Sequence, residues 1–439
     1  MKVVKFGGSS VASAAQFKKV KKIVLDEPAR KIVVTSACGK ASKDDYKVTD
    51  LLYLCYSHIQ YGVPCDELFS RIEEKYLAIK KQLRLKLDLA REFDIIRQNM
   101  TGDISVDYLV SRGEYLAALM LAEYLDADFV DAKDIIIYNY DGTVDMHAAT
   151  ENIKKYLKSG RRIVVPGFYG AYRDGSIRIM SRGGSDFTGA VLANITDASI
   201  YENWTDVSGI LVADPRIVDD PAHIKRVTYS ELRELSYMGA NVLQDEAVFP
   251  MKSKNIPINI RNTNAPEDEG TIIVASCEVQ DKKDPPGPIT GITGKKDYTV
   301  INIVKNKGSS EVGCLRKLLE VFEQYQISIE SIPMSVDTIG IVVESKAIEK
   351  NLYEIIGTLQ DDYDVDDVHV LKNMALMAVV GRGMRENTGI SGKLFAELGK
   401  NKINISTINQ GSDELSIIVG VDNDELEHAI RCIYNKFIR

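Results

Sequence analysis

Two glycine-rich clusters have the residue types that hold phosphate and carboxylate groups. The first reads Lys5-Phe6-Gly7-Gly8-Ser9-Ser10 and separates an apolar run from a helical pattern. Two glycines let the backbone approach a phosphate, the amides at a helix start favour an anion, and Lys5 adds a positive charge. A plain glycine turn between a strand and a helix is the simpler interpretation of this cluster taken alone.

The second cluster reads Ser181-Arg182-Gly183-Gly184-Ser185-Asp186 and also closes a predicted strand and opens a predicted helix. The Arg182 guanidinium is suited to gripping a carboxylate through two parallel hydrogen bonds, and Asp186 is suited to an ammonium group or a position near magnesium. Two Gly-Gly loops on one α/β sheet would hold two anionic groups face to face. That arrangement fits phosphoryl transfer between two small substrates.

Two further clusters give weaker signals. Trp204-Thr205-Asp206-Val207-Ser208-Gly209 follows a predicted strand, where α/β sheets bind ligands, and the nearby Arg216 suits nucleotide phosphates. A capped turn with a solvated arginine explains this cluster as well. Ser111-Arg112-Gly113-Glu114 interrupts an apolar helical pattern with a glycine and three polar residues, which is locally costly and often functional. A buried ion pair or a close helix contact is the alternative.

The elements that would position these clusters alternate between β and α over the first 265 or so residues. This alternation predicts an α/β sandwich with a mainly parallel central sheet. The predicted helices include Ala14–Leu25, Asp107–Leu125, Phe187–Asn194 and Tyr229–Met238. The predicted strands are Val3–Phe6, Lys31–Thr35, Phe129–Asp131, Ile135–Tyr138, Ile163–Val165, Ile200–Trp204, Pro257–Arg261 and Thr271–Ala275, with a hairpin of Phe168–Ala171 and Ile177–Met180.

A charged, proline-rich segment at 278–288 precedes a region of different rhythm. A βαββα pattern occurs there twice, at a period of roughly 75 residues, which predicts two ferredoxin-like modules. The predicted helices are Gly313–Tyr325, Asn351–Gln360, Ile390–Lys400 and Asp422–Tyr434, and the predicted strands are Tyr298–Val304, Ser328–Pro333, Gly340–Glu344, Ala375–Val380, Ile403–Ile408 and Glu414–Val421.

The composition argues against several functional classes. The 439 residues include 55 Lys and Arg against 63 Asp and Glu, a net charge of −8, which disfavours nucleic acid or an anionic membrane as the main partner. The sequence has no P-loop, no protein-kinase motif, no Cys-x-x-Cys pair and no apolar run as long as a membrane span. The N-terminal apolar run is too short for a signal peptide, so we expect a cytoplasmic protein without a zinc site.

Taken together, the clusters resemble the aspartate kinases of the amino-acid kinase family, and the duplicated module is similar to their paired ACT regulatory domains. The resemblance covers the whole chain. It implies a catalytic domain over 1–277, a linker over 278–288, and a first ACT domain over 297–366 inserted in a second one formed by 289–296 and 367–439. The matching motifs are Lys5 to Ser10, Ser36-Ala37-x-Gly39, Thr49-Asp50-Leu51-Leu52, Ser111-x-Gly113-Glu114, Pro166-Gly167-Phe168, Arg182 to Asp186 and Trp204-Thr205-Asp206-Val207.

The resemblance implies a phosphotransferase that uses ATP and Mg²⁺ to phosphorylate the β-carboxylate of L-aspartate, a first step toward lysine, threonine and methionine. Because that carboxylate is ionised at neutral pH, the reaction needs no general base. The implied catalytic residues are Lys5 and Asp186. The implied nucleotide ligands are Lys5, Gly7, Gly8, Ser9, Thr205, Asp206, Arg216 and Asn241, and the implied aspartate ligands are Ser36, Thr49, Glu114, Phe168, Arg182, Gly184, Ser185 and Asp186.

Two positions depart from the family pattern. Leu211 stands where the family usually has a tyrosine, and Asn241 replaces the lysine of a Gly-Ala-Lys-Val-Leu motif. Because a neutral amide lacks the charge directed at phosphate, we expect weaker ATP binding rather than a loss of catalysis.

The C-terminal half resembles forms that end-product amino acids inhibit. Lys305 with Glu311-Val312-Gly313 is similar to lysine-sensitive forms, some of which also need threonine. The resemblance further implies that Ile289–Thr293 pairs with C-terminal strands and that ACT pairing gives a homodimer or a dimer of dimers. ACT domains that only dimerise are the alternative. The implied effector-binding residues are Gly313, Ser328, Ile329 and Glu330.

Two other functions stay open at this point. Another kinase of the same fold would act on acetylglutamate, glutamate, carbamate or UMP, and the ACT pair and the Ser-x-Gly-Glu helix argue against it. A catalytically weakened amino-acid sensor is supported by Asn241 and opposed by Lys5, Glu114, Arg182 and Asp186. We expect no dehydrogenase domain, because the sequence lacks a dinucleotide fingerprint.

Overall fold

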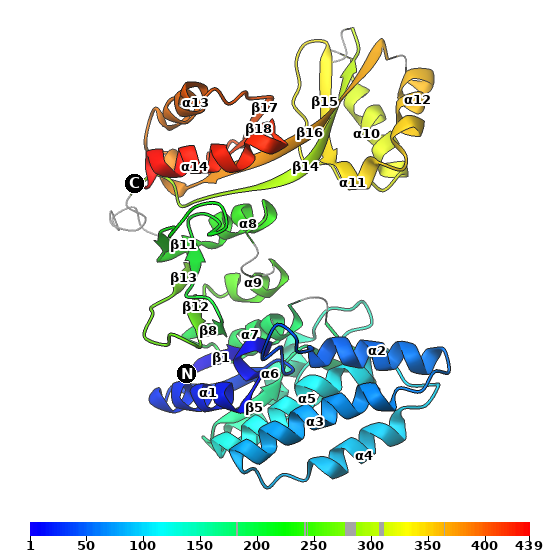
Figure 1. Cartoon of the computed structure of the whole chain (residues 1–439), viewed down its shortest axis with the longest axis vertical. Helices are drawn as coiled ribbons and strands as arrows, with labels where there is room; N and C mark the ends of the chain where they lie inside the picture. Colours follow the sequence, from blue (N-terminus) through cyan, green and yellow to red (C-terminus); the bar gives the residue numbers. More distant parts are fainter. Residues whose placement is uncertain (181–182, 241–242, 244, 277–286, 307–310, 364) are drawn as a thin grey trace. The chain divides into compact units, whose positions relative to one another are not determined.

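The computed structural model describes residues 1–180, 183–240, 243, 245–276, 287–306, 311–363 and 365–439. They form two compact units, which Figure 1 shows with the chain coloured from its N-terminus to its C-terminus. The first unit consists of Met1–Ile210, Lys225–Tyr229 and Asn241–Cys277. The second consists of Leu211–Ile224, Ser230–Ala240 and Glu278–Arg439.

An eight-stranded sheet forms the centre of the first unit. Its strand order is β11-β13-β12-β8-β1-β2-β5-β3, and all neighbours run parallel except β12 and β13. This confirms the predicted α/β fold with a mainly parallel sheet. The strands are β1 (Lys2–Phe6), β2 (Arg30–Thr35), β3 (Asp128–Phe129), β5 (Ile163–Pro166), β8 (Ile200–Thr205), β11 (Arg226–Thr228), β12 (Ile258–Asn262) and β13 (Thr271–Val274).

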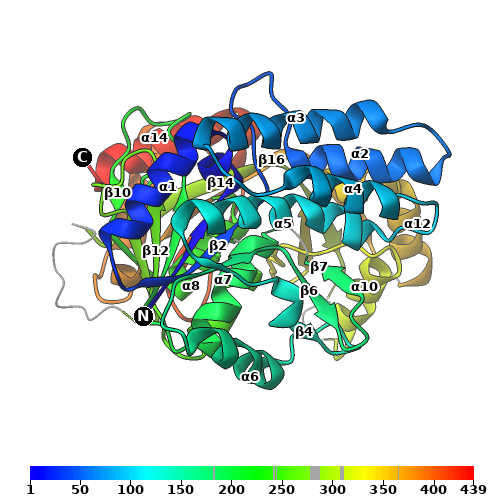
Figure 2. The ribbon, with the colours of Figure 1, turned by 90° about the horizontal axis from the view of Figure 1, so that it is seen from below.

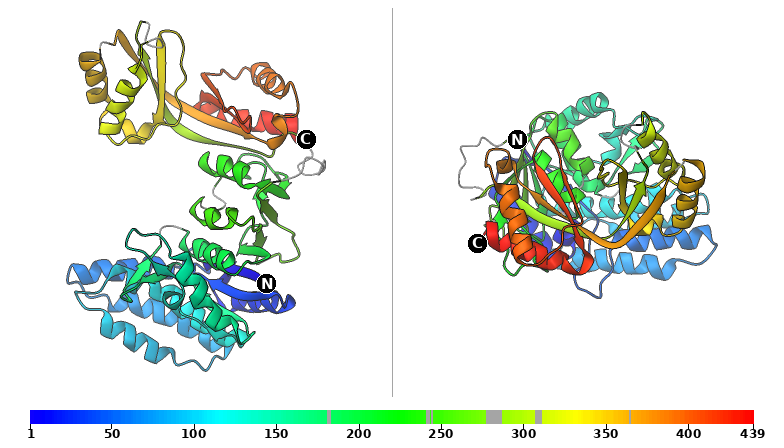
Figure 3. Two further views of the ribbon diagram at one scale, coloured as in Figure 1. Left: turned by 180° about the vertical axis from the view of Figure 1, so that it is seen from behind. Right: turned by 90° about the horizontal axis from the view of Figure 1, so that it is seen from above.

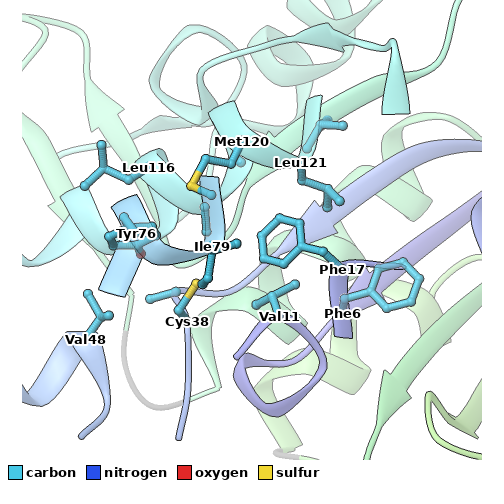
Figure 4. Close-up of a cluster of buried hydrophobic side chains, with 14 of the residues drawn as sticks. Phe6, Val11, Phe17, Cys38, Val48, Tyr76, Ile79, Leu116, Met120 and Leu121 are labelled. Carbon is cyan, nitrogen blue, oxygen red and sulfur yellow. The ribbon is translucent and has the colours of Figure 1, made fainter. Parts of the chain in front are cut away.

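Helices cover both faces of this sheet, as Figure 2 shows. Because strand side chains alternate between faces, Val4 and Phe6 enter an apolar cluster with α1 and α5, while Lys5 faces α7. Figure 4 shows part of that cluster, in which Phe6 lies near Phe17. One face carries α1 (Ala14–Asp26), α2 (Val48–Gln60), α3 (Asp66–Leu83), α4 (Leu89–Asn99) and α5 (Val106–Leu125). The other carries α6 (Met146–Leu157) and α7 (Gly184–Ile195), and α9 (Asp245–Lys252) packs against α7.

A three-stranded sheet of β4 (Ile137–Tyr138), β6 (Tyr169–Tyr172) and β7 (Ile177–Ile179) contains the predicted hairpin. Two predicted strands are shorter than expected. The Phe129–Asp131 strand ends at Phe129, because the Asp131 side chain accepts a hydrogen bond from the Lys133 N–H and starts a 3-10 turn. The Ile135–Tyr138 strand loses its first two residues to the end of that turn. Helix α9 was not predicted, because it contains Pro250, which normally ends a helix.

The second unit is built on a five-stranded sheet of order β15-β14-β16-β18-β17. The two longest strands, β14 (Gly291–Val304) and β16 (Asp367–Val380), run through the whole sheet (Figure 3). Helices α10 (Cys314–Gln324), α11 (Ser345–Ile348) and α12 (Leu352–Asp362) pack on the part with β15 (Thr338–Glu344). Helices α13 (Ile390–Lys400) and α14 (Leu426–Phe437) pack on the part with β17 (Thr407–Gln410) and β18 (Ser416–Asp422).

The pairing of Gly291 with Val380 confirms the expectation that Ile289–Thr293 joins C-terminal strands. Two predicted strands are corrected. Ser328–Pro333 is not a strand but an extended segment with one bridge, between Ser331 and Val342. The strand predicted at Ile403–Ile408 begins only at Thr407, because Lys402 adopts a positive φ of 61° after α13.

The remaining elements are β9 (Ile210–Leu211), β10 (His223–Ile224) and α8 (Tyr229–Tyr237). Among the described residues, no helix combines the length and the apolar character needed to cross a membrane.

Candidate active site

Lys5 is held at the carboxyl end of β1 by two polar side chains. Its ammonium nitrogen lies 2.6 Å from Asp186 Oδ1 and 3.4 Å from Asn203 Oδ1. Asn203 is the register partner of Lys5 on β8, and its Nδ2 donates to the same Asp186 oxygen at 3.0 Å. Lys5 is only 7 % exposed, so this pairing offsets the cost of burying its charge. Lys5, Asp186 and Asn203 therefore form one fixed polar cluster.

The first glycine cluster lies against the backbone that follows β2. The Gly39 N–H donates to the Gly8 carbonyl at 2.9 Å, and a Cβ atom at Gly39 would lie 2.6 Å from the Gly8 carbonyl carbon. The two loops therefore approach more closely than a side chain at Gly39 allows. The cluster ends in a short 3-10 turn, Gly8–Val11, which no side chain caps.

The second glycine cluster starts α7 with Gly183, whose φ of 77° is in the left-handed region. Among the residues that the structure describes, no side chain caps this helix, so its first N–H groups are available to an anion. Gly184 lets Phe168 approach, since a Cβ atom there would lie 2.6 Å from Phe168 Cδ2. Phe168 itself has a φ of 76°, a strained conformation for an aromatic residue, and its N–H donates to Thr188 Oγ1 at 3.0 Å.

Glu114 of α5 is an acid buried within this region. Its side chain is nearly inaccessible, and Oε2 has no hydrogen-bond partner among the described residues. Burial raises the pKa of Glu114 to about 8, although the Ala37 backbone N–H and the charge of Arg112 act in the opposite direction. A buried carboxyl group with an open oxygen is suited to receive a ligand's ammonium group.

The other members of the Ser111–Glu114 motif have structural roles. Gly113 lets α5 approach the end of β2, since a Cβ atom there would lie 2.9 Å from Ala37 Cβ. The Arg112 guanidinium lies over the rings of Tyr108 and Tyr115, at 4.7 and 4.6 Å from their centroids. The motif therefore combines one candidate ligand, Glu114, with the residues that bring it to the site.

These groups surround one cavity of about 610 Å³ in the first unit. The predicted site residues that line it are Lys5, Gly8, Ser9, Ser36, Thr49, Glu114, Phe168, Gly184, Ser185, Asp186 and Asp206. Gly7 and Thr205 are chain neighbours of lining residues and do not line it themselves. Arg216 belongs to the second unit, where it forms an ion pair with Asp214 at 2.6 Å. Arg182 and Asn241 lie outside the described residues.

Sequence reasoning missed several residues of this site. Asn203 lies inside a strand that reads as buried core, and only its polar character marks it. Lys40 and Lys47 line the cavity from a charged stretch between two recognised motifs, and Asp50 belongs to the second of them. Trp204, which the sequence analysis named in its motif, stacks on Phe6 and does not line the cavity.

The predicted effector residues lie in the second unit. Gly313 caps α10 with a φ of 84°, and in the described part of the chain no side chain caps that helix. The Glu330 N–H donates to the Val342 carbonyl of β15 at 2.8 Å, and Ser328 and Ile329 precede it in the extended segment. The Lys305–Glu311 pair that the sequence singled out is an ion pair of 3.3 Å.

Comparisons with known proteins show the family and the fold of the chain. The model of the amino acid kinase family matches residues 1–262, and an ACT domain model matches residues 377–437. Aspartokinase 3 of Bacillus subtilis is 35 % identical over 452 residues, covering 100 % of this chain and 98 % of the relative. The crystal structure of Clostridium acetobutylicum aspartate kinase superposes with a TM-score of 0.93 at 45 % identity, covering 100 % of both chains.

Two structures of E. coli aspartokinase III share the fold at 23 % identity. One is a complex with aspartate and ADP in the R-state, with a TM-score of 0.74 and 99 % of each chain covered. The other is a complex with lysine and aspartate in the T-state, with a TM-score of 0.76 and 100 % of each chain covered.

Proposed function

Because the chain belongs to the amino acid kinase family and is an aspartokinase with a C-terminal ACT region, we propose that the 610 Å³ cavity is where ATP phosphorylates L-aspartate. One observation carries this assignment. The cavity brings together the ammonium group of Lys5, which Asp186 holds in place, and the open oxygen of the buried Glu114. A cation for phosphate and an anion for ammonium are the two charges needed to hold ATP and an amino acid in one site.

The aspartate side of the cavity consists of Glu114, Ser36, Thr49, Phe168 and Ser185. Glu114 receives the α-ammonium group, which provides the counter-charge that its buried oxygen lacks. The α7 N-terminus donates its uncapped amides, from Gly184 onward, to a carboxylate. Arg182, the residue before Gly183, is assigned to a carboxylate from its place in the motif alone.

The nucleotide side consists of Lys5, the Gly7–Ser9 backbone, Thr205 and Asp206, with Arg216 and Asn241 assigned from the sequence alone. The close approach of Gly8 and Gly39 leaves backbone rather than side chain facing the phosphates. The Escherichia coli enzyme of the same fold binds ADP and aspartate together, which supports assigning two neighbouring subsites.

The chemistry requires position and charge more than proton transfer. The aspartate β-carboxylate attacks the γ-phosphorus, the bond from that phosphorus to the bridging oxygen breaks, and ADP leaves. Lys5 offsets the negative charge that spreads over the transferred group, while Asp186 and Asn203 fix its ammonium at 2.6 and 3.4 Å. No described side chain has to act as a base in this step.

Magnesium enters the site as part of the MgATP substrate. Among the residues that the structure describes, no group of three or more His, Cys, Asp or Glu side chains is placed to hold a metal ion. The phosphate oxygens of ATP are the ligands that Mg²⁺ uses in nucleotide sites, together with one or two carboxylates. Four carboxyl side chains line the cavity, those of Asp50, Glu114, Asp186 and Asp206, and we assign Asp186 and Asp206 to the metal.

The second unit regulates the enzyme through an amino-acid effector, for which lysine, alone or with threonine, is our assignment. Gly313 and Ser328–Glu330 form the effector site, with the uncapped α10 N-terminus for a carboxylate and Glu330 for an ammonium group. Lysine binds the E. coli enzyme in its T-state, which supports this assignment.

The domain boundaries proposed from the resemblance are 1–277 for catalysis, 297–366 for the first ACT domain, and 289–296 with 367–439 for the second. We further propose a cytoplasmic enzyme that forms a dimer or a dimer of dimers through its ACT domains. Strand β17 supports pairing, because it lies at an edge of the five-stranded sheet and its Ile408 is half exposed.

The experiment that tests the proposed function is ADP release from the full chain with ATP, Mg²⁺ and L-aspartate. Release that depends on aspartate and falls when lysine, or lysine with threonine, is added supports both assignments. Release with acetylglutamate, glutamate, carbamate or UMP in place of aspartate would overturn the substrate. Activity that neither amino acid changes would overturn the effector, and binding without turnover would favour the weakened sensor.

A further inference from the structure

A charged segment of the first unit, residues 40–47, connects two motifs of the active site. It follows Gly39, whose N–H donates to the Gly8 carbonyl, and it leads into α2, whose second residue is Thr49. The segment contains three lysines, Lys40, Lys43 and Lys47, and it is largely exposed. None of its residues was needed in the reaction described above.

The segment is fastened to α3 by Lys75. The Lys75 ammonium donates to the Gly39 carbonyl at 2.6 Å, to Asp45 Oδ2 at 2.7 Å and to the Tyr46 carbonyl at 3.0 Å. These bonds use all three of its N–H donors, and its side chain is only 13 % exposed. The Lys75 ammonium therefore binds the backbone on both sides of the segment, at Gly39 and at Tyr46. These two bonds hold the start and the end of the segment at a fixed separation.

Asp45, within the segment, also helps to fix its conformation. Its carboxylate accepts from the Ala41 N–H at 2.7 Å and from the Tyr46 N–H at 2.8 Å, in addition to Lys75. Burial alone would raise the pKa of Asp45, but these hydrogen bonds and the charge of Lys75 outweigh it and lower the pKa. Arg71, also on α3, lies over the Tyr46 ring at 5.5 Å.

Two of the three lysines of the 40–47 segment lie at the cavity. Lys40 and Lys47 line it, whereas Lys43 does not. In the described part of the chain, neither Lys40 nor Lys47 forms an ion pair, so both charges are available to an anionic ligand. Lys40 is next to Gly39, at the Gly8 loop, and Lys47 is two residues before Thr49.

We propose that Lys40 and Lys47 recognise the two anionic substrates, Lys40 the ATP phosphates and Lys47 an aspartate carboxylate, and that Lys75 is the positioning residue that keeps both at the cavity. This proposal rests on the proposed function of the cavity and adds residues to it. Phosphates and carboxylates are the ligands that lysine ammonium groups bind most strongly, and both substrates carry them.

The test of the two lysines is a comparison of Lys40→Ala, Lys47→Ala and Lys43→Ala in the full chain. Losing one charge-assisted hydrogen bond is expected to raise a KM by about tenfold. Lys40→Ala should raise the KM for ATP, Lys47→Ala should raise the KM for aspartate, and Lys43→Ala should change neither. If the KM values of Lys40→Ala and Lys47→Ala equal those of Lys43→Ala, the lysines do not recognise substrate.

The role of Lys75 requires a readout that general loss of stability would not give. Lys75→Met should raise both KM values with a smaller effect on kcat. In the Lys40→Ala/Lys47→Ala background the same change should raise them little further, because the groups it positions are gone. Equal effects of Lys75→Met in both backgrounds would contradict positioning through these lysines. Melting temperatures of all variants separate the KM effects from unfolding.

Failure of this proposal is distinguishable from failure of the proposed function. If the wild-type chain releases no ADP in the presence of aspartate, the function itself is wrong. If the wild type is active and the lysine variants keep wild-type KM values, only the role of the 40–47 segment is wrong.

Discussion

Glu114→Gln is the substitution that best tests how the site holds aspartate. The carboxyl group is buried, its Oε2 has no partner within the part of the chain that the structure describes, and burial raises its pKa to about 8. Below that pH the group is mostly protonated and neutral, so aspartate binding must displace a proton before Glu114 pairs with the ammonium group. We expect the affinity for aspartate to rise with pH up to about 8 and to level off above it.

The raised pKa of Glu114 sets the free-energy cost of ionising its side chain in the folded protein. Moving the pKa from 4.5 to about 8 corresponds to about 5 kcal/mol of unfavourable free energy for the ionised side chain, as an upper limit. Because the pKa of the folded state is raised, the contribution of Glu114 to stability is fully present below pH 4.5 and is lost as the pH rises through about 8. Bound aspartate should restore part of that loss.

Calorimetric titration of aspartate in buffers of different ionisation enthalpy counts the protons released. At pH 7 the wild type should release close to one proton per aspartate bound, whereas Glu114→Gln should release none from this position and bind more weakly at pH 8. Glu92→Gln is the matched control, because Glu92 accepts a hydrogen bond from Tyr115 of α5 but does not line the cavity. Equal proton release by the wild type and Glu114→Gln would refute the assignment of the ammonium group to Glu114.

Three further predictions concern other parts of the chain. Lys5→Met should lower kcat by about 10² to 10³, because it removes the charge that faces the transferred phosphoryl group, and single-turnover kinetics would show whether it does. Glu231→Ala should reduce the free energy of unfolding, measured in urea titrations, by about 3 kcal/mol. The reason is that Glu231 is fully buried and lies 2.9 Å from Arg382, which loses this carboxylate in the variant. An unchanged urea midpoint would argue against that ion pair. Asn241→Lys should lower the KM for ATP, and an unchanged KM would show that the departure has no effect on the nucleotide.

Much of the candidate site was predictable because its residues stand at the ends of strands. Lys5, Gly8 and Asp186 belong to short local patterns that signal a strand, a turn and a helix start in order. Glu114 was predictable for the opposite reason, since a charge within an apolar helical pattern conflicts with its surroundings. In each case the signal lies within a few residues of sequence.

The features that sequence reasoning missed depend on pairing across the fold. Asn203 becomes part of the site through its register with Lys5 on the neighbouring strand, a separation of 198 residues. Lys75 reads as one more charge on an amphipathic helix, and only the fold brings it to Gly39 and Asp45. The Ser328–Pro333 segment has strand composition, but it forms a single bridge with β15 rather than a ladder.

The most direct test of the account is trapping of the product with hydroxylamine. An acyl phosphate formed on aspartate reacts with hydroxylamine to a hydroxamate, which simple hydrolysis of ATP cannot give. The account predicts hydroxamate formation that requires both ATP and L-aspartate in the wild type and is nearly lost in Lys5→Met. ADP release without any hydroxamate, or equal hydroxamate yields from the wild type and Lys5→Met, would contradict it.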